Sequence, residues 1–154
     1  MQLEAKLISL DDDLQILVDQ INSGQWDEVN ELETYSADAL HAYLQLKDTV
    51  FVACYVVENE QPTFAGMASA RLEQKPYDFS KWLYVDEVDT CSNMRKQGVG
   101  TALMNKLIEY ADANDCDEVW LGADKDNTDA NTFYVSLKPD SIDPVVGYTF
   151  ELED

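Results

Sequence analysis

The sequence predicts an α/β (α+β) fold in which a mixed central sheet of about six to seven strands is flanked by about four helices. Two observations predict this class. Runs rich in β-branched and aromatic residues alternate along the chain with runs in which apolar residues recur every three or four positions. With 154 residues, 45% of them hydrophobic, the chain is long enough for one core and short for two. We therefore expect residues 1–154 to form a single domain.

The first elements are a strand and two helices. The apolar residues Leu3, Leu7, Ile8 and Leu10 suggest the strand. The three aspartates at 11–13 supply an N-cap and first-turn acids for a helix whose apolar positions lie within 14–21. Ser23-Gly24 ends that helix. A second helix is predicted over residues 31–46, from apolar positions three or four apart.

The remaining elements alternate between strands and helices. The run V-F-V-A-C-Y-V-V at 50–57 predicts a buried strand, and a turn at 59–62 predicts that residues 63–73 return antiparallel to it. Four further elements are a strand, a helix, a strand and a short helix, over residues 82–90, 101–113, 118–123 and 129–137. A last strand is predicted over 145–152.

The segment R-K-Q-G-V-G-T-A, residues 95–102, joins a predicted strand to a predicted helix. Gly98 and Gly100 lack a Cβ, so the chain can turn sharply and direct several backbone N–H groups at one point. The following helix adds its positive N-terminal end. The segment therefore predicts an anion-binding loop, although a plain strand-to-helix turn would have the same glycines.

Two motifs resemble those of the GNAT family of acetyl-CoA-dependent N-acetyltransferases. Residues 95–102 fit the family's R/Q-x-x-G-x-G/A pyrophosphate loop. About 30 residues later, D-N-T-D-A-N-T-F-Y places Asn127, Ala130 and Tyr134 like the family's N-x-x-A-x-x-x-Y motif. The residues of both motifs are also similar to those of the aminoglycoside 3-N-acetyltransferase branch of the family. The final connection, after Leu137, is longer than the L-G-F of many relatives.

This resemblance implies a GNAT fold with strands four and five splayed to admit the cofactor. The cofactor is acetyl-CoA, with its pyrophosphate held by the backbone of the glycine loop and its pantetheine arm paired with the end of strand four. The residues implied in cofactor binding are Val88, Asp89, Thr90, Arg95, Lys96, Gln97, Gly98, Val99, Gly100, Thr101, Asn127, Ala130 and Tyr134. Asn127 has a second interpretation, because an asparagine there would also cap the following helix. We expect no metal.

Acetyl transfer to an amine needs a proton donor for the departing thiolate, and Tyr134 is the candidate. Its phenol is neutral at ordinary pH and can give up a proton. Tyrosine is also the family's usual choice at this position. The alternative is that Tyr134 packs as a helix aromatic, with its neighbour Phe133 as the inward residue.

The base that takes a proton from the amine is predicted on strand four. Glu87 is the first candidate, because it precedes Arg95 by eight residues, and Asp86 is the second. Alternation along the strand puts Asp86 and Val88 on one face and Glu87 and Asp89 on the other, so the acids are not expected to share one site. A carboxylate is a weak base for an ammonium group, and solvated strand acids are the alternative.

Acceptor binding is predicted between the first two helices, the segment that commonly binds acceptor in the family. There Trp26 could stack on a ligand, and Asp27, Glu28 and Glu31 could hold ammonium groups. Solvated loop acids are the alternative. His41, the single histidine, is predicted to lie on the surface of the second helix.

The composition of the chain limits the kinds of partner that it is expected to bind. A formal charge of −21 argues against nucleic acid and for a cationic partner, although solubility or a salty habitat would also account for it. The three cysteines are odd in number and widely spaced, which indicates reduced thiols. No apolar run is long enough for a membrane span and no signal peptide is evident, so we expect a cytoplasmic protein. A homodimer is compatible with the sequence.

The sequence therefore predicts an acetyl-CoA-dependent N-acetyltransferase that acts on a cationic small-molecule amine, with an aminoglycoside-like polyamine favoured. A diamine, polyamine or peptide amine is the alternative acceptor. A different class of function is also possible for this pattern: a GNAT-fold module that binds acyl-CoA without catalysing a reaction.

Overall fold

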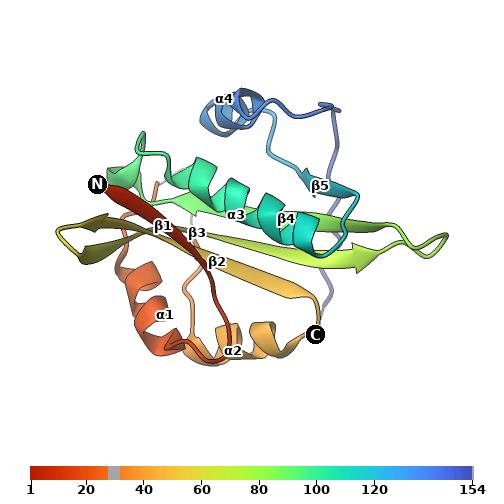
Figure 1. The fold of residues 1–154 in the computed structure, drawn as a ribbon. Coiled ribbons are helices and arrows are strands. Elements are labelled where there is room, and N and C mark those ends of the chain that lie inside the picture. The colour runs from red at the N-terminus through yellow and green to blue at the C-terminus, as the bar shows by residue number, and fades with distance from the viewer. Residues whose placement is uncertain (28–31, 154) are drawn as a thin grey trace. The chain divides into compact units, whose positions relative to one another are not determined.

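The computed structural model describes residues 1–27 and 32–153. The chain divides into two compact units, Met1–Leu121 and Gly122–Asp154. Figure 1 shows the helices and strands of both. Among the described residues, the first unit contains the sheet and three of the four α-helices.

The sheet has five strands in the order β1-β2-β3-β4-β5. The first four strands pair antiparallel, and β4 pairs with β5 in parallel. The sheet is therefore mixed, as the sequence predicted. Its strands are β1 (Gln2–Leu7), β2 (Thr49–Glu58), β3 (Gln61–Gln74), β4 (Lys81–Thr90) and β5 (Glu118–Leu121).

Helices cover both faces of this sheet (Figure 1): α3 (Val99–Ala113) lies on one face, and α1 (Leu14–Ser23) and α2 (Ala37–Gln45) lie on the other. A short 3₁₀ turn, η1 (Ser92–Met94), joins β4 to the loop before α3. The packing explains why β2 and β3 have apolar residues on both faces.

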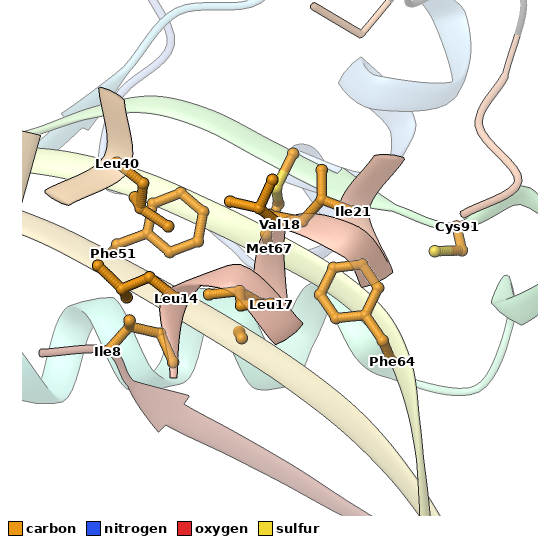
Figure 2. Close-up of a cluster of buried hydrophobic side chains, with 11 residues drawn as sticks. Ile8, Leu14, Leu17, Val18, Ile21, Leu40, Phe51, Phe64, Met67 and Cys91 are labelled. Carbon is orange, nitrogen blue, oxygen red and sulfur yellow. The ribbon is translucent and has the colours of Figure 1, made fainter. Parts of the chain in front are cut away.

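The core on the α1 and α2 side is built from one face of the sheet and the inward stripe of α1. Figure 2 shows this cluster, in which the side chains of α1 meet those of β2 and β3. Ile21 and Met67 are almost completely buried at its centre. The apolar spacing that predicted the first helix therefore marks its buried side: Leu14, Leu17, Val18 and Ile21.

The ends of these helices and strands are set by capping side chains and by turn residues. Asp13 accepts a hydrogen bond from the Ile16 N–H (3.1 Å) at the start of α1, which confirms the predicted N-cap. Asn59 and Glu60 both have positive φ in the two-residue β2–β3 turn, the geometry of a type I′ hairpin. On β3, a Cβ at Gly66 would lie 2.6 Å from the Asp89 carbonyl oxygen, so only glycine fits beside this part of β4.

The second predicted helix is shorter than expected. Ser36 caps α2 by accepting a hydrogen bond from the Ala39 N–H (3.0 Å), so the helix begins at Ala37 and residues 32–36 are not helical. Residues 28–31 lie outside the described part. The apolar spacing at Leu32 and Tyr35 reflects packing against the core cluster rather than helix.

The second unit contains α4 (Thr128–Ser136), which lies within one residue of the predicted helix at both ends. The predicted strand over 145–152 was wrong, because none of the described residues 139–153 forms a strand. A strand needs a pairing partner, and none of the pairings in the described sheet includes this segment. The sheet therefore has five described strands instead of six to seven, while the four helices agree.

Candidate active site

The glycine loop ends in a left-handed turn. Gly98 has φ +88° and is the N-cap of α3, and it supplies no side-chain cap. A Cβ there would be an ordinary 3.4 Å from Leu3, so the backbone conformation rather than crowding calls for glycine. The first hydrogen bond of the helix runs from the Ala102 N–H to the Gly98 carbonyl (2.9 Å). The N–H groups of residues 99–101 come before this bond and have no acceptor within the helix. They therefore point out of the helix end, where they can bind an anion.

Arg95, which opens this loop, is paired with the predicted acceptor segment. Its Nη2 lies 2.8 Å from the Asp27 carboxylate. Next to it, the Ser92 N–H donates to the Gln25 carbonyl (2.7 Å). The structure thus brings together residues about 68 positions apart that the sequence assigned to two different binding regions.

Beyond Val85, β4 pairs only with β3. Its parallel pairing with β5 covers Trp82 to Val85, and residues 86–90 have no partner on that side among the described strands. The pairing stops because β5 ends at Leu121, so the second half of β4 is left open at the place where the GNAT resemblance implied a gap between strands four and five. The unpaired edge of residues 86–90 offers backbone N–H and C=O groups to an extended ligand.

A β-bulge breaks the alternation of β4. Glu87 lies opposite Ser69 and Val85 lies opposite Ala70, so Asp86 is the extra residue. The expectation that Asp86 shares a face with Val88, away from Glu87, was therefore wrong. A bulge reorients the side chains next to it, and here Asp86 and Glu87 line one cavity.

This cavity lies on the α1 and α2 side of the sheet and has a volume of about 360 Å³. Its walls combine aromatic rings with acidic side chains. Tyr35 packs edge to face on Phe51, with ring centroids 6.2 Å apart, and its backbone is held by two 2.9 Å hydrogen bonds with the Asn22 side chain. The residues that matter chemically are Glu33, Tyr35, Tyr43, Phe51, Asp86 and Glu87.

The two strand acids differ in their partners. Asp86 is bound by Arg71, whose Nη1 lies 2.5 Å from Asp86 Oδ1, and Arg71 also holds Glu73. Glu87 forms no ion pair with another described residue. The structure therefore leaves Glu87 as the acid that can meet a cationic ligand, while Asp86 already has a counterion.

The side chain of Asp89 is less exposed than that of Asp86 or Glu87. It is opposite Met67, and its Oδ2 is buried with no hydrogen-bond partner among the described residues. Burial raises its pKa to about 6, and the nearby Glu87 adds to the rise. Tyr35 is affected by the same surroundings: burial, with Glu87 and Asp89, raises its pKa to about 12, so its phenol stays neutral.

Trp26 packs into the molecule. Its Nε1 donates to the Ile21 carbonyl (2.8 Å), and its ring meets Phe64 edge to face at 6.0 Å. These contacts give Trp26 a structural role that the sequence did not suggest, and its predicted role in acceptor binding remains untested. Glu28 and Glu31, also predicted to bind acceptor, lie outside the described residues.

The second motif lies entirely in the second unit. Asn127 caps α4 by accepting a hydrogen bond from the Ala130 N–H (3.1 Å), which is the structural alternative that the sequence left open. Tyr134 is half-buried on the same helix, and its ring lies 5.1 Å from that of Phe133. The motif residues thus set the start of α4 and place a phenol near its end.

Sequence reasoning missed several residues of the cavity. Glu33, Tyr35 and Tyr43 line it, although the predicted acceptor segment ended at Glu31 and both tyrosines fall within the helix predicted over 31–46. The tyrosines' neighbouring acids were the available signal, since an aromatic residue beside carboxylates suits a cationic ligand.

The described part of the chain lacks both a metal-binding cluster and a helix that could span a membrane. Residues 1–27 and 32–153 contain no group of three or more histidine, cysteine or acidic side chains arranged to hold a metal ion. Within the same residues, no helix has the length and apolar character to span a membrane.

Comparison with known proteins gives the family. Residues 18–137 match the family model described as Acetyltransferase (GNAT) family. The chain belongs to the GNAT family. It is thus an N-acetyltransferase, of a family that generally uses acetyl-CoA. Comparison with curated protein sequences gives no match.

Solved structures of low sequence identity share the fold of this GNAT protein. An aminoglycoside acetyltransferase, meta-AAC0020 from an uncultured soil metagenomic sample in complex with trehalose, has a TM-score of 0.82 at 21% identity, covering 98% of this chain and 97% of its own. Aminoglycoside acetyltransferase HMB0005, also from an uncultured soil metagenomic sample, gives 0.76 at 16% identity, covering 99% and 100%. Glucosamine-6-phosphate N-acetyltransferase from Arabidopsis thaliana gives 0.72 at 13%, covering 98% and 100%.

Proposed function

We propose that this GNAT protein transfers the acetyl group of acetyl-CoA to a primary amine of a cationic small molecule, and that an aminoglycoside-like polyamine is the favoured acceptor. The observation that carries this proposal is the acidic, aromatic-lined cavity beside the unpaired edge of β4. A cationic amine fits the cavity, and an extended pantetheine arm fits the edge.

The glycine loop suits the pyrophosphate of the cofactor. The left-handed Gly98 and the uncapped start of α3 leave N–H groups directed outward, and neither Gly98 nor Gly100 has a side chain to obstruct phosphate. Lys96, Gln97, Val99 and Thr101 contribute backbone rather than side-chain chemistry. Bound acetyl-CoA would supply the acetyl thioester, and Val88, Asp89 and Thr90 would pair with its arm.

Glu87 is the base in this proposal. Its carboxylate lines the cavity without an ion partner, so it can bind the acceptor ammonium and take its proton, directly or through water. Asp86 faces the same cavity but is neutralised by Arg71, which makes it a weaker candidate. The amine must lose its proton before it can attack the thioester carbon.

Tyr134 is the proposed acid for the departing thiolate, since its phenol can donate a proton. Asn127 and Ala130 hold the start of the helix that carries it. Their roles toward the cofactor rest on the motif alone.

The acceptor class rests on charge and on likeness of fold. Two acids without an ion pair among the described residues, Glu33 and Glu87, line the cavity, which suits an acceptor with more than one ammonium group. Two of the solved structures similar to this chain are aminoglycoside acetyltransferases. A simple polyamine or a peptide amine is the alternative acceptor, and we expect the enzyme to act in the cytoplasm.

An acceptor screen tests the proposal. The purified protein is incubated with acetyl-CoA and one member of each amine class, and the release of free thiol is followed. We expect release with aminoglycosides above that with monoamines. Binding of acetyl-CoA without release for any amine would instead favour a non-catalytic acyl-CoA-binding module.

A further inference from the structure

Residues 148–152, Y-T-F-E-L, form an apolar and exposed segment near the end of the chain. Tyr148, Phe150 and Leu152 are 81%, 87% and 91% exposed, and they alternate with polar residues. In an extended chain this alternation places the three apolar side chains on one face. The described chain contains no turn or bend from residue 141 to residue 153, so the segment does not fold back on the residues just before it.

This segment has the features of a strand except a pairing partner. None of the pairings in the described sheet includes it, so its backbone N–H and C=O groups are open to another strand. Monomeric proteins seldom expose a contiguous apolar surface of this kind unless it binds a partner. An extended segment with one apolar face is suited to the open edge of a sheet, where the backbone groups pair and alternate side chains pack.

The outer edge of β5 is such a place. β5 pairs with β4 on one side, and none of the described strands pairs with its other side. A row of aromatic rings crosses β4 and ends at this edge: the ring centroid of Tyr84 lies 5.7 Å from that of Trp82 and 6.0 Å from that of Trp120. Trp120 is the outermost ring of the row and is 39% exposed. An aromatic side chain on an added strand would extend the row, which is a favourable cross-strand contact.

A second copy of this chain is the occupant that fits both features. Each copy has one unpaired segment and one unpaired edge, so two copies related by a two-fold axis satisfy both at once.

The charges near the two features are also complementary. Glu151 and Glu153 accompany the apolar segment. Beside the aromatic row, Lys75 Nζ lies 4.0 Å from the centre of the Trp82 ring, and Lys75 forms no ion pair with another described residue. The net charge of −21 opposes the association of two copies, but physiological salt screens exposed charges more than about 8 Å apart.

The surface is large enough for a stable dimer. An aromatic side chain buries roughly 150–250 Å², so Tyr148 and Phe150 of two copies together bury roughly 600–1,000 Å². Leu152 and the surface around Trp120 add to this area. Stable interfaces bury about 1,200–2,000 Å² in total, so the exchange of two such segments is of the size that a stable dimer needs.

We propose that residues 148–152 of each copy pair with the outer edge of β5 in a second copy, with Phe150 beside Trp120 of the partner subunit, so that the protein is a homodimer. The inference concerns assembly and does not depend on the proposed acetyl transfer. It also accounts for the strand that the alternation over 145–152 predicted, because the edge with which that strand pairs then belongs to another molecule.

Sedimentation velocity of the full chain, at about 0.15 M salt, measures the association. We expect a species of twice the 17.4 kDa mass of one chain. Phe150→Ser should raise the dissociation constant of the dimer by about tenfold or more, because the dimer loses two central rings. Phe79→Ser is the matched control, since it removes an equally exposed phenylalanine, 89% against 87%, from the hairpin between β3 and β4. A monomeric wild type overturns the proposal, as does a dimer that Phe150→Ser weakens no more than Phe79→Ser.

A cross-link shows which copy supplies the edge. Trp120→Cys and Phe150→Cys proteins, both also carrying Cys116→Ser, are prepared separately, mixed and oxidised, and the chain mass is read on a non-reducing gel. We expect a disulfide-linked pair of chains in the mixture and in neither protein alone. A mixture without a linked pair overturns the proposal.

The double variant Trp120→Cys/Phe150→Cys separates the two possible edges. A link between two chains supports the proposal, whereas a link within one chain places the segment on its own edge and overturns it. If Trp120→Cys does not fold, the comparison of Phe150→Ser with Phe79→Ser decides alone. None of these readouts needs turnover, so failure of the proposed function would leave them unaffected.

Discussion

At the scale of single residues, the two loop glycines serve different needs. Gly98 has a backbone conformation that residues with a side chain rarely adopt, whereas Gly100 lies in the first turn of α3, where we propose that the cofactor phosphate approaches the backbone. The sequence pattern alone treats the two as equivalent. A substitution that reports on binding rather than folding should therefore be made at Gly100.

We expect Gly100→Val to weaken acetyl-CoA binding without unfolding the protein, because a branched side chain would occupy the space that phosphate needs. Calorimetry measures the affinity. Gly147→Val is the matched control, since a Cβ at Gly147 has nothing within 4 Å. Equal affinity in folded Gly100→Val and wild type would exclude this loop as the pyrophosphate site.

Tyr134→Phe tests the proposed acid, because it removes one hydroxyl and keeps the ring. We expect turnover to fall by roughly 10²- to 10⁴-fold, as for other general acids, with acetyl-CoA affinity nearly unchanged. Tyr77→Phe removes a hydroxyl from an exposed hairpin residue and should have no effect. Full turnover of Tyr134→Phe, with chemistry rate-limiting, would assign the proton to water or another group.

At the scale of elements, the ends of α1 and the extent of β2 were easier to predict than the middle of β4. Asp13, Ser23-Gly24 and the β-rich run of β2 have local chemistry that fixes an element wherever it packs. The bulge at Asp86 does not, because it depends on how β3 pairs across the sheet. That single extra residue decides which acids line the cavity. The side chains that form the site therefore could not be predicted from the regular alternation of faces along a strand.

The ion pair between Arg95 and Asp27 connects the glycine loop, which we propose binds the cofactor pyrophosphate, to the segment after α1, which we propose binds the acceptor. An exposed pair of this kind contributes only about 0–1 kcal/mol to stability, so its interest lies in binding. Phosphate and Asp27 would compete for the same guanidinium.

We expect Asp27→Asn to tighten acetyl-CoA binding by about two- to fivefold, the equivalent of roughly 0.5–1 kcal/mol for a surface charge pair. Calorimetry at low and high salt measures it, and the gain should shrink as salt screens the pair. Asp19→Asn, on the exposed side of α1, is the control for a lost charge. Weaker binding in Asp27→Asn would mean that Asp27 holds Arg95 in place for the cofactor.

At the scale of the whole molecule, the alternation of strand-like and helix-like runs predicted the fold class correctly, but it predicted more strands than the five of the described sheet. Residues 145–152 alternate like a strand, yet Tyr148, Phe150 and Leu152 are 81%, 87% and 91% exposed and none belongs to the described sheet. Alternating apolar residues indicate a preference for the extended conformation. Forming a strand also requires an open sheet edge to pair with, and the local sequence does not specify one.

The charge of −21 gives a prediction that concerns the whole molecule. Such a protein attracts a cationic acceptor and repels an anionic cofactor, and salt screens both effects. We therefore expect the KM of a polyamine acceptor to rise with salt more than the KM of acetyl-CoA, in initial-rate measurements across ionic strengths at constant pH. A monoamine is the matched comparison, because it has no further ammonium group to meet the remaining acids. If the polyamine and the monoamine respond equally, the charge acts as a general field, and specificity must come from the shape of the cavity.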